Sequence, residues 1–269
     1  MKVRLIILAI AALAILSALG IHDETPEVRE WDVAHQSLPD FKIALLSDFH
    51  FSTPEDLERL SLIKRQLLLH NPDLIFFAGD YIGSYQIYDS VSRDVIVDAL
   101  EALAYPKPVI AVLGNHDNWD SHQAWAEAFN RSSITLLENS VTKIRLANSD
   151  ICIRGLGDYY SGYYSPTEIP NECGDLILTL THDPKGLLAE KPELDTVSFA
   201  GHTHCGQIAF PFIGAPIVPT AAPKETHCGR FDIGHIGITS GGLGTSIIPL
   251  RFGPNTEPGW ELIQIQHLK

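Results

Sequence analysis

Five apolar runs in this sequence of 269 residues each end in side chains that bind divalent metal ions. The residues that follow the runs are Asp48, His50, Asp80, Asn115, His116, Asp117, His182, His202 and His204. Carboxylate, amide and imidazole groups are common protein ligands of such ions. Three Asp or Asn oxygens and four imidazole nitrogens from this set exceed what one ion of ordinary coordination number needs. The pattern therefore favours two ions that share a bridging carboxylate.

The runs themselves are typical of buried strands, because a strand covered on both faces reads as continuous Val, Ile, Leu and Phe. They occupy residues 43–47, 74–77, 109–113 and 176–180, and the residues just before Gly201. Ligands of α/β sheets gather just beyond the carboxyl ends of the strands. We therefore expect the metal-binding side chains to face one shared crevice.

Helices are predicted between the strands in the first half of the chain. The first has a cap at Ser52 or Thr53, Pro54 at its first helical position and its end at Asn71. Two more are predicted over 90–104 and 121–129. This alternation of strands and helices favours a parallel sheet.

The second half of the chain is richer in strands. Antiparallel strands are predicted near 134–138, 141–146 and 150–155, and alternation predicts half-exposed strands over 231–238 and 260–265. Two facing mixed β-sheets with helices outside would accommodate both halves. We therefore expect one α/β (α+β) domain over residues 41–269.

Residues 1–21 are typical of a targeting or anchoring segment, with two basic residues before the apolar stretch 5–19. A helix over that stretch would span about 22 Å, against a hydrocarbon core of about 30 Å. It is either a membrane anchor, which we favour, or a signal peptide cleaved after Gly20, with Ala18 and Gly20 as the small residues at positions −3 and −1 of the cleavage site. Both interpretations place the domain on the extracytoplasmic side, secreted or periplasmic if the segment is cleaved. Residues 22–40 are expected to be a linker.

The composition argues against several classes of protein. Acidic residues outnumber basic ones 33 to 19, whereas proteins that bind nucleic acids carry basic patches, so no nucleic-acid partner is expected. No Gly-x-Ser-x-Gly motif of a serine hydrolase is present. Four cysteines, Cys152, Cys173, Cys205 and Cys228, allow three pairings, and an exported domain would be in an oxidising compartment. The sequence does not choose among these pairings or free thiols.

The five segments together resemble the calcineurin-like metallophosphoesterase superfamily, from about residue 41 to the end. The shared pattern reads Asp48-x-His50, Gly79-Asp80, Gly114-Asn115-His116-Asp117, a lone His182, and Gly201-His202-Thr203-His204. The C-terminal stretches 242–246 and 249–252 are similar to those of the bacterial membrane-associated phosphodiesterase branch. The resemblance implies a double β-sandwich flanked by helices.

The resemblance also implies two divalent metal ions. It assigns Asp48, His50, Asp80 and His204 to one ion. It assigns Asp80, Asn115, His182 and His202 to the second ion, so that Asp80 is the bridge. Mixed carboxylate and imidazole ligands suit Mn²⁺, Fe²⁺ or Zn²⁺ better than Ca²⁺, and the sequence does not choose among these three.

The expected reaction is hydrolysis of a phosphodiester or pyrophosphate bond by attack of a hydroxide that bridges the two ions. By the family pattern His116 stabilises or protonates the leaving oxygen, although a structural histidine is the alternative. Asp117 is expected to orient His116, or to cap a helix, or both. The tyrosines at 159, 160, 163 and 164 form either an aromatic wall of the site or a packed surface loop.

We therefore expect a metal-dependent phosphodiesterase with a small-molecule or lipid-linked phosphoester substrate and a membrane attachment through its N-terminal segment. A pyrophosphate hydrolase of UDP-2,3-diacylglucosamine would carry the same residues, although that substrate is made in the cytoplasm and the expected topology faces outward. A phosphomonoesterase or a metal-binding scaffold without activity would also fit the pattern. The sequence makes no prediction of the oligomeric state.

Overall fold

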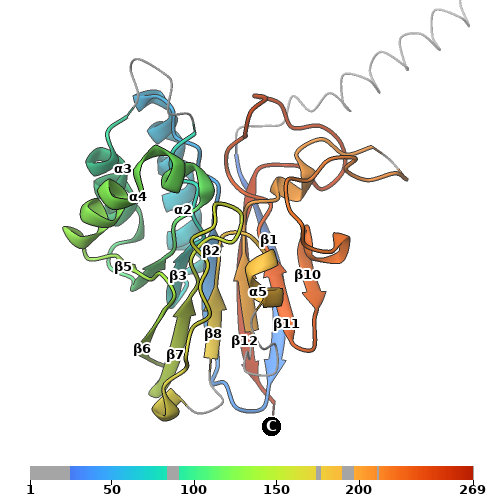
Figure 1. Cartoon of the computed structure of the whole chain (residues 1–269). Coiled ribbons are helices and arrows are strands. Elements are labelled where there is room, and N and C mark those ends of the chain that lie inside the picture. The colour runs from blue at the N-terminus through green and yellow to red at the C-terminus, as the bar shows by residue number, and fades with distance from the viewer. Residues whose placement is uncertain (1–24, 84–90, 174–176, 190–196, 211, 269) are drawn as a thin grey trace, which may run out of the picture.

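Two six-stranded mixed β-sheets face one another, with helices on their outer sides (Figure 1). The computed structural model describes residues 25–83, 91–173, 177–189, 197–210 and 212–268. The predicted fold of two facing mixed sheets is confirmed. The expected anchor or signal peptide, residues 1–21, lies outside the described residues. None of the described helices is long and apolar enough to cross a membrane.

The first sheet carries most of the helices. Its strand order is β1 (Glu27–His35), β12 (Gly259–His267), β2 (Phe41–Leu46), β3 (Leu74–Phe77), β4 (Val109–Ala111) and β5 (Thr135–Leu136). The strands β2 to β5 are parallel, and β12 runs antiparallel to β2. Its outer face packs against α2 (Leu60–His70), α3 (Arg93–Ala104) and α4 (Asn115–Asn130).

The second sheet has a parallel centre and antiparallel edges. Its order is β10 (Gly229–Asp232), β11 (Ile236–Thr239), β9 (Val197–Ala200), β8 (Ile177–Leu180), β7 (Ser149–Gly155) and β6 (Ser140–Leu146). The short helix α5 (Lys185–Ala189) covers its outer face through Leu187, which packs with Leu156 and Phe231.

The main core lies between the two sheets. Leu45 and Phe76 from the first sheet pack in one cluster with Ile153, Leu178 and Phe199 from the second. All five side chains are fully buried, so this layer is closed to solvent. Since apolar contact between the sheets fixes their separation, it also fixes the distance between strand ends that belong to different sheets.

Two helices differ from their expected bounds. The segment predicted as one helix from Pro54 consists of a 3-10 helix, η1 (Pro54–Arg59), followed by α2. Asn71 is the C-cap residue of α2 and has the left-handed conformation, with φ 48°. The helix α4 begins at Asn115, directly after Gly114, rather than near residue 121. A non-helical Ser121 divides it, with φ −175° and ψ 97°. The early start places Asn115 and Asp117 in the first helical turn.

Two expectations about strands are wrong. Residues 22–40 were expected to be a linker, but they contain β1, which pairs parallel with β12 along nine residues. Val33 of β1 is fully buried, and Trp31 packs on the core between the sheets. The charged residues of β1 interrupt the apolar alternation that would have predicted a strand from the sequence. The strand β5 pairs parallel with β4, whereas an antiparallel partner was expected; β6 and β7 are antiparallel as predicted.

All four cysteines are paired. Cys152 is bonded to Cys173, and Cys205 is bonded to Cys228. The first pair joins β7 to the 3-10 helix η2 (Asn171–Cys173), and the second joins the 3-10 helix η4 (His204–Gly206) after β9 to the residue just before β10.

Val33→Ala tests whether β1 belongs to the domain. Removal of two buried methyl groups is expected to lower the free energy of unfolding of the full chain by about 2 kcal/mol. Urea denaturation measures this as a lower midpoint at an unchanged slope. Ala34→Ser, at the exposed neighbouring position, is the matched control. Equal midpoints for the two variants would mean that this stretch contributes no core packing.

Candidate metal centre

Seven of the nine side chains singled out from the sequence come together where five strands end. Asp48 and His50 follow β2, Asp80 follows β3, Asn115 follows β4, His182 follows β8, and His202 and His204 follow β9. Each of the seven is at most 5% exposed. Three strands of one sheet and two of the other therefore supply one buried cluster.

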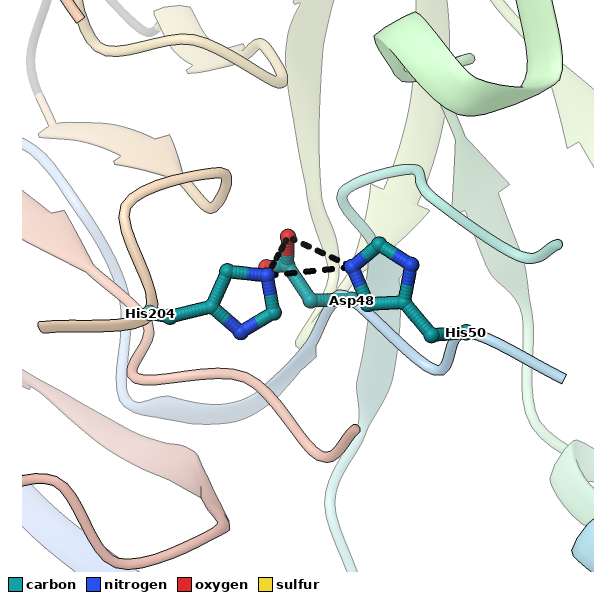
Figure 2. Close-up of side chains that lie close together, drawn as sticks. All are labelled: Asp48, His50 and His204. Carbon is teal, nitrogen blue, oxygen red and sulfur yellow. Dashed lines mark hydrogen bonds and ion pairs between the residues drawn. The ribbon is translucent and has the colours of Figure 1, made fainter. Parts of the chain in front are cut away.

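One half of the cluster consists of Asp48, His50 and His204 (Figure 2). The Nε2 atoms of the two histidines are 3.0 Å apart. Asp48 Oδ1 lies 3.4 Å from His204 Nε2 and 3.9 Å from His50 Nε2. Three potential ligand atoms thus surround one point.

The other half is built around His182. Its Nε2 lies 3.1 Å from Asn115 Oδ1, 3.1 Å from His202 Nδ1 and 3.3 Å from Asp80 Oδ2. The same Oδ2 of Asp80 is 3.6 Å from His50 Nε2 in the first half. This carboxylate oxygen faces both halves, which is the position that a bridging ligand needs.

The hydrogen bonds of the histidines show that the cluster fits cations. His182 Nδ1 contacts the Ala78 carbonyl oxygen and His202 Nε2 contacts the Pro219 carbonyl oxygen, each at 2.6 Å. A carbonyl only accepts, so each of these two nitrogens must carry a proton. When both rings are neutral, as metal ligands must be, the remaining nitrogens, 3.1 Å apart, present two lone pairs to each other. Buried Asp48 Oδ1 also has no hydrogen-bond partner among the residues that the structure describes. A divalent ion in each half would satisfy the inward-facing groups, and backbone contacts of this kind orient metal-binding histidines.

Burial and mutual charge shift the protonation of the cluster strongly. Burial lowers the pKa of His50 to about 3, and burial together with His50 holds the pKa of His204 well below its ordinary value. These two rings are therefore neutral, as metal ligands must be. Burial raises the pKa of Asp48. For Asp80 burial acts in the same direction, but His182, His116 and His50 together outweigh it and hold the pKa well below its usual value.

Much of the backbone of the cluster is left-handed. Asp48, His50, Asp80, His202 and His204 have φ angles of 52°, 49°, 54°, 69° and 51°. Such conformations cost non-glycine residues on the order of 1–3 kcal/mol each and persist where the surroundings dictate them. One such constraint is Gly114, where a Cβ would lie 2.2 Å from Asp80 Oδ1. The Gly-Asp and Gly-Asn pairs of the sequence pattern are therefore packing partners.

Asp117 lies beside the cluster and holds its backbone. One of its oxygens accepts from the N–H groups of Gly114 and Asp80, and the other accepts from those of Tyr81 and Ile82. Within the described part of the chain no hydrogen bond joins Asp117 to His116, so the expected orienting contact is not found. Asp117 is instead the third residue of α4 and accepts from the N–H of Gly114, the N-cap residue. Burial raises its pKa well above the usual value.

His116 lies at the edge of the cluster and is half-buried. Its backbone N–H donates to Asp80 Oδ1 at 2.9 Å, and its Nε2 is 3.4 Å from Ser246 Oγ. Its ring centroid is 4.8 Å from that of His50. A side chain in this position can reach a group bound at the two halves.

Arg251 is a site residue whose role was not predicted from the sequence. Its buried guanidinium lies 3.0 Å from His204 Nδ1 and donates to the carbonyl oxygens of Gly244 and Thr256 at 3.0 and 2.9 Å. Burial lowers its pKa to about 10. Arg251 is the only Asp, Glu, Lys or Arg between residues 233 and 256, and such a lone charge could have indicated it.

Two exposed aromatic side chains border the cluster. The ring centroid of Tyr160 is 4.7 Å from that of His202, and that of Trp119 is 5.6 Å from that of His116. The two aromatic rings are 5.9 Å apart. Of the four tyrosines considered in the sequence, Tyr160 therefore adjoins the site, whereas Tyr163 stacks on His122.

Comparison with known proteins agrees with this geometry. The family model described as calcineurin-like phosphoesterase matches residues 41–206. Phosphodiesterase YaeI of Escherichia coli is 32% identical over 66% of this chain and 66% of its own length. The uncharacterized metallophosphoesterase YkuE of Bacillus subtilis is 30% identical over 79% of this chain and 75% of its own. UDP-2,3-diacylglucosamine pyrophosphatase LpxG of Chlamydia muridarum is 25% identical over 64% of this chain and 65% of its own.

Metal content tests the assignment of the two halves. The full chain loaded with Mn²⁺ is expected to retain about two ions after desalting, Asp80→Asn fewer than one, and His204→Ala about one. Inductively coupled plasma mass spectrometry measures these ratios. Asp150→Asn, at an exposed position of β7, serves as the control and should retain the full content. Full occupancy in Asp80→Asn would contradict the shared position of that carboxylate.

Arg251→Lys tests the contact to His204. A lysine keeps the charge but cannot donate to all the partners of the guanidinium, so we expect about 10- to 100-fold weaker binding of one of two ions. Titration with Mn²⁺ followed by calorimetry measures both affinities. Arg145→Lys, at an exposed ion pair with Asp150, should leave both unchanged. Unaltered binding in Arg251→Lys would show that His204 does not need this contact.

Proposed function

The chain belongs to the calcineurin-like phosphoesterase family, whose members hold a dinuclear divalent metal centre, and we propose that it is a phosphodiesterase. In this proposal Asp48, His50, Asp80 and His204 hold one ion. Asp80, Asn115, His182 and His202 hold the second ion. The observation that supports this most directly is the position of Asp80 Oδ2, within 3.6 Å of nitrogens from both halves.

The chemistry divides between the ions and the chain. When bound, two divalent ions supply Lewis acidity toward a phosphoryl group and an activated water. His116, whose Nε2 lies at the edge of the cluster near Ser246, donates a proton to the leaving oxygen. Asp117 fixes the backbone from which Asp80 and His116 extend, so it is a positioning residue. The buried strand ends exclude bulk water from the ligand atoms, whereas the less buried His116, Trp119 and Tyr160 border the open side of the centre.

The aromatic side chains beside the metal centre favour a diester substrate with an organic substituent. The exposed rings of Trp119 and Tyr160 lie next to His116 and His202, so they can contact the part of a substrate that carries the phosphate. The name of YaeI supports a phosphodiesterase. The name of LpxG supports the alternative of a nucleotide-linked lipid pyrophosphate, UDP-2,3-diacylglucosamine.

We place the domain on the extracytoplasmic side of a membrane, attached by the apolar segment 5–19. Two disulfides in the described residues support this, because disulfides persist in oxidising compartments and are rare in the cytosol. This location disfavours the cytoplasmic UDP-2,3-diacylglucosamine as the substrate.

Hydrolysis of a chromogenic phosphodiester and of the matching monoester tests the proposal. With Mn²⁺ the full chain should cleave the diester faster, and a chelator should abolish both activities. His116→Asn should lower kcat by about 10²- to 10⁴-fold while the metal content stays unchanged, because only proton donation is lost. His122→Asn, at an ion pair with Glu138 away from the cluster, is the matched control.

Three outcomes would redirect the proposal. Faster cleavage of the monoester would indicate a phosphomonoesterase. Stoichiometric metal without cleavage of either ester, or of UDP-2,3-diacylglucosamine, would indicate a metal-binding scaffold. Unchanged turnover in His116→Asn would remove the proton-donor role of that residue.

A further inference from the structure

An unusual loop follows the metal-binding residues of β9. The sequence 208–223 contains no charged residue in sixteen positions, and Thr220 is its only hydrogen-bonding side chain. Yet this loop is at the surface: Phe212 is 109% exposed, Ile217 79% and Ile213 69%. Large apolar side chains that gather on a surface mark an interaction site.

A second loop extends the same surface. Ile247 is 96% exposed, and Ile248 and Leu250 beside it are exposed as well. The side chain of Gln207 ties the two loops together, since its Nε2 donates to the carbonyl oxygens of Ser246 and Ile248 at 3.1 and 2.8 Å. The rings of Phe210 and Phe252 also pack together, with centroids 5.8 Å apart. We name the apolar rim the exposed side chains of Phe210, Phe212, Ile213, Ile217, Ile247, Ile248 and Leu250.

The apolar rim adjoins the metal centre through both of its loops. The first loop begins just after His204 and includes Pro219, whose carbonyl oxygen contacts His202. The second includes Ser246, which contacts His116. Whatever covers the rim therefore also lies next to the open side of the centre.

The N-terminal part of the chain enters at this same end of the molecule. Glu27, the first residue of β1, pairs with Gly259, and Glu261 pairs with Leu45, just before Asp48. Figure 1 shows the start of β1 at the end of the sheets where the orange and red loops of the rim lie. The strongly apolar stretch 5–19 is thus joined to the domain on the side of the rim.

We propose that the apolar rim is a membrane-docking surface that inserts into the interface of the lipid bilayer. The seven side chains of the rim are Phe, Ile and Leu, and such side chains fit the boundary between headgroups and acyl chains, where the nearby Lys224 could contact headgroups. The chain that precedes β1 would enter the same bilayer. Docking would hold the metal centre at the level of the headgroups, where phosphoesters of lipids lie. This inference deepens the proposed membrane attachment and does not depend on hydrolysis.

Quenching of tryptophan fluorescence by lipids brominated on their acyl chains tests the proposal. The full chain is reconstituted in phosphatidylcholine vesicles, and Phe212→Trp and Ile247→Trp are each compared with the unsubstituted protein to subtract its native tryptophans. Leu69→Trp is the matched control, because Leu69 is 80% exposed at the end of α2, near the opposite ends of the strands. We expect the two rim tryptophans to be quenched at least about twofold more than the control.

Equal quenching of the rim and control tryptophans would overturn the proposal. A second result would also overturn it: weak quenching of the rim tryptophans, together with a change from dimer to monomer in the double variant Phe212→Ser/Ile247→Ser. This result would show that the rim is a contact between copies of the chain. Hydrolysis of the soluble diester by the two rim tryptophan variants separates this from the proposed function. If the rim tryptophans are not quenched but hydrolysis is normal, only the membrane-docking proposal is contradicted. If the unsubstituted protein does not hydrolyse the diester, only the proposed phosphodiesterase function is contradicted.

Discussion

The structure depends on hydrogen-bond acceptors of several side chains that face one another in a buried site. His182 and His202 each contact a backbone carbonyl with one nitrogen, so in the neutral rings the other two nitrogens face each other as acceptors, next to the carboxylate of Asp80. In a buried site such a group of acceptors is unfavourable unless positive charge lies among them. Burial lowers the pKa of His182, but Asp80, Asp48 and Asp158 together raise it well above its ordinary value, so the need for positive charge in the site also appears as a high proton affinity of this ring.

The apolar core between the two sheets sets the position of one sheet relative to the other. Neither sheet alone supplies a complete half of the centre: Asp48 and His50 from the first sheet meet His204 from the second, and Asp80 and Asn115 meet His182 and His202. The apolar contacts between the sheets therefore contribute to function, since a change in their separation would move ligands of both halves apart. Five of the seven ligand residues, all except Asn115 and His182, have left-handed backbone at these strand ends.

Prediction from the sequence succeeds where a property is repeated along the chain. Each of five strands has its own apolar run and ligand residue, so the residues from Asp48 to His204 can be grouped from the sequence alone. It fails where a single residue depends on its tertiary surroundings. The burial of Val33 in β1 depends on a partner strand more than 200 positions later, and the carboxylate of Asp117 was assigned to a neighbouring side chain although it binds backbone N–H groups of two segments. Arg251 has no motif of its own, because most of its partners are carbonyl oxygens.

The disulfide between Cys205 and Cys228 turns the loop after β9 into a covalent ring. That ring begins next to His204, contains Pro219, and carries Phe210, Phe212, Ile213 and Ile217 of the apolar rim. A closed ring has fewer conformations to lose on folding than an open loop of the same length. One covalent ring therefore contains both the rim residues of this loop and the Pro219 carbonyl oxygen that contacts His202.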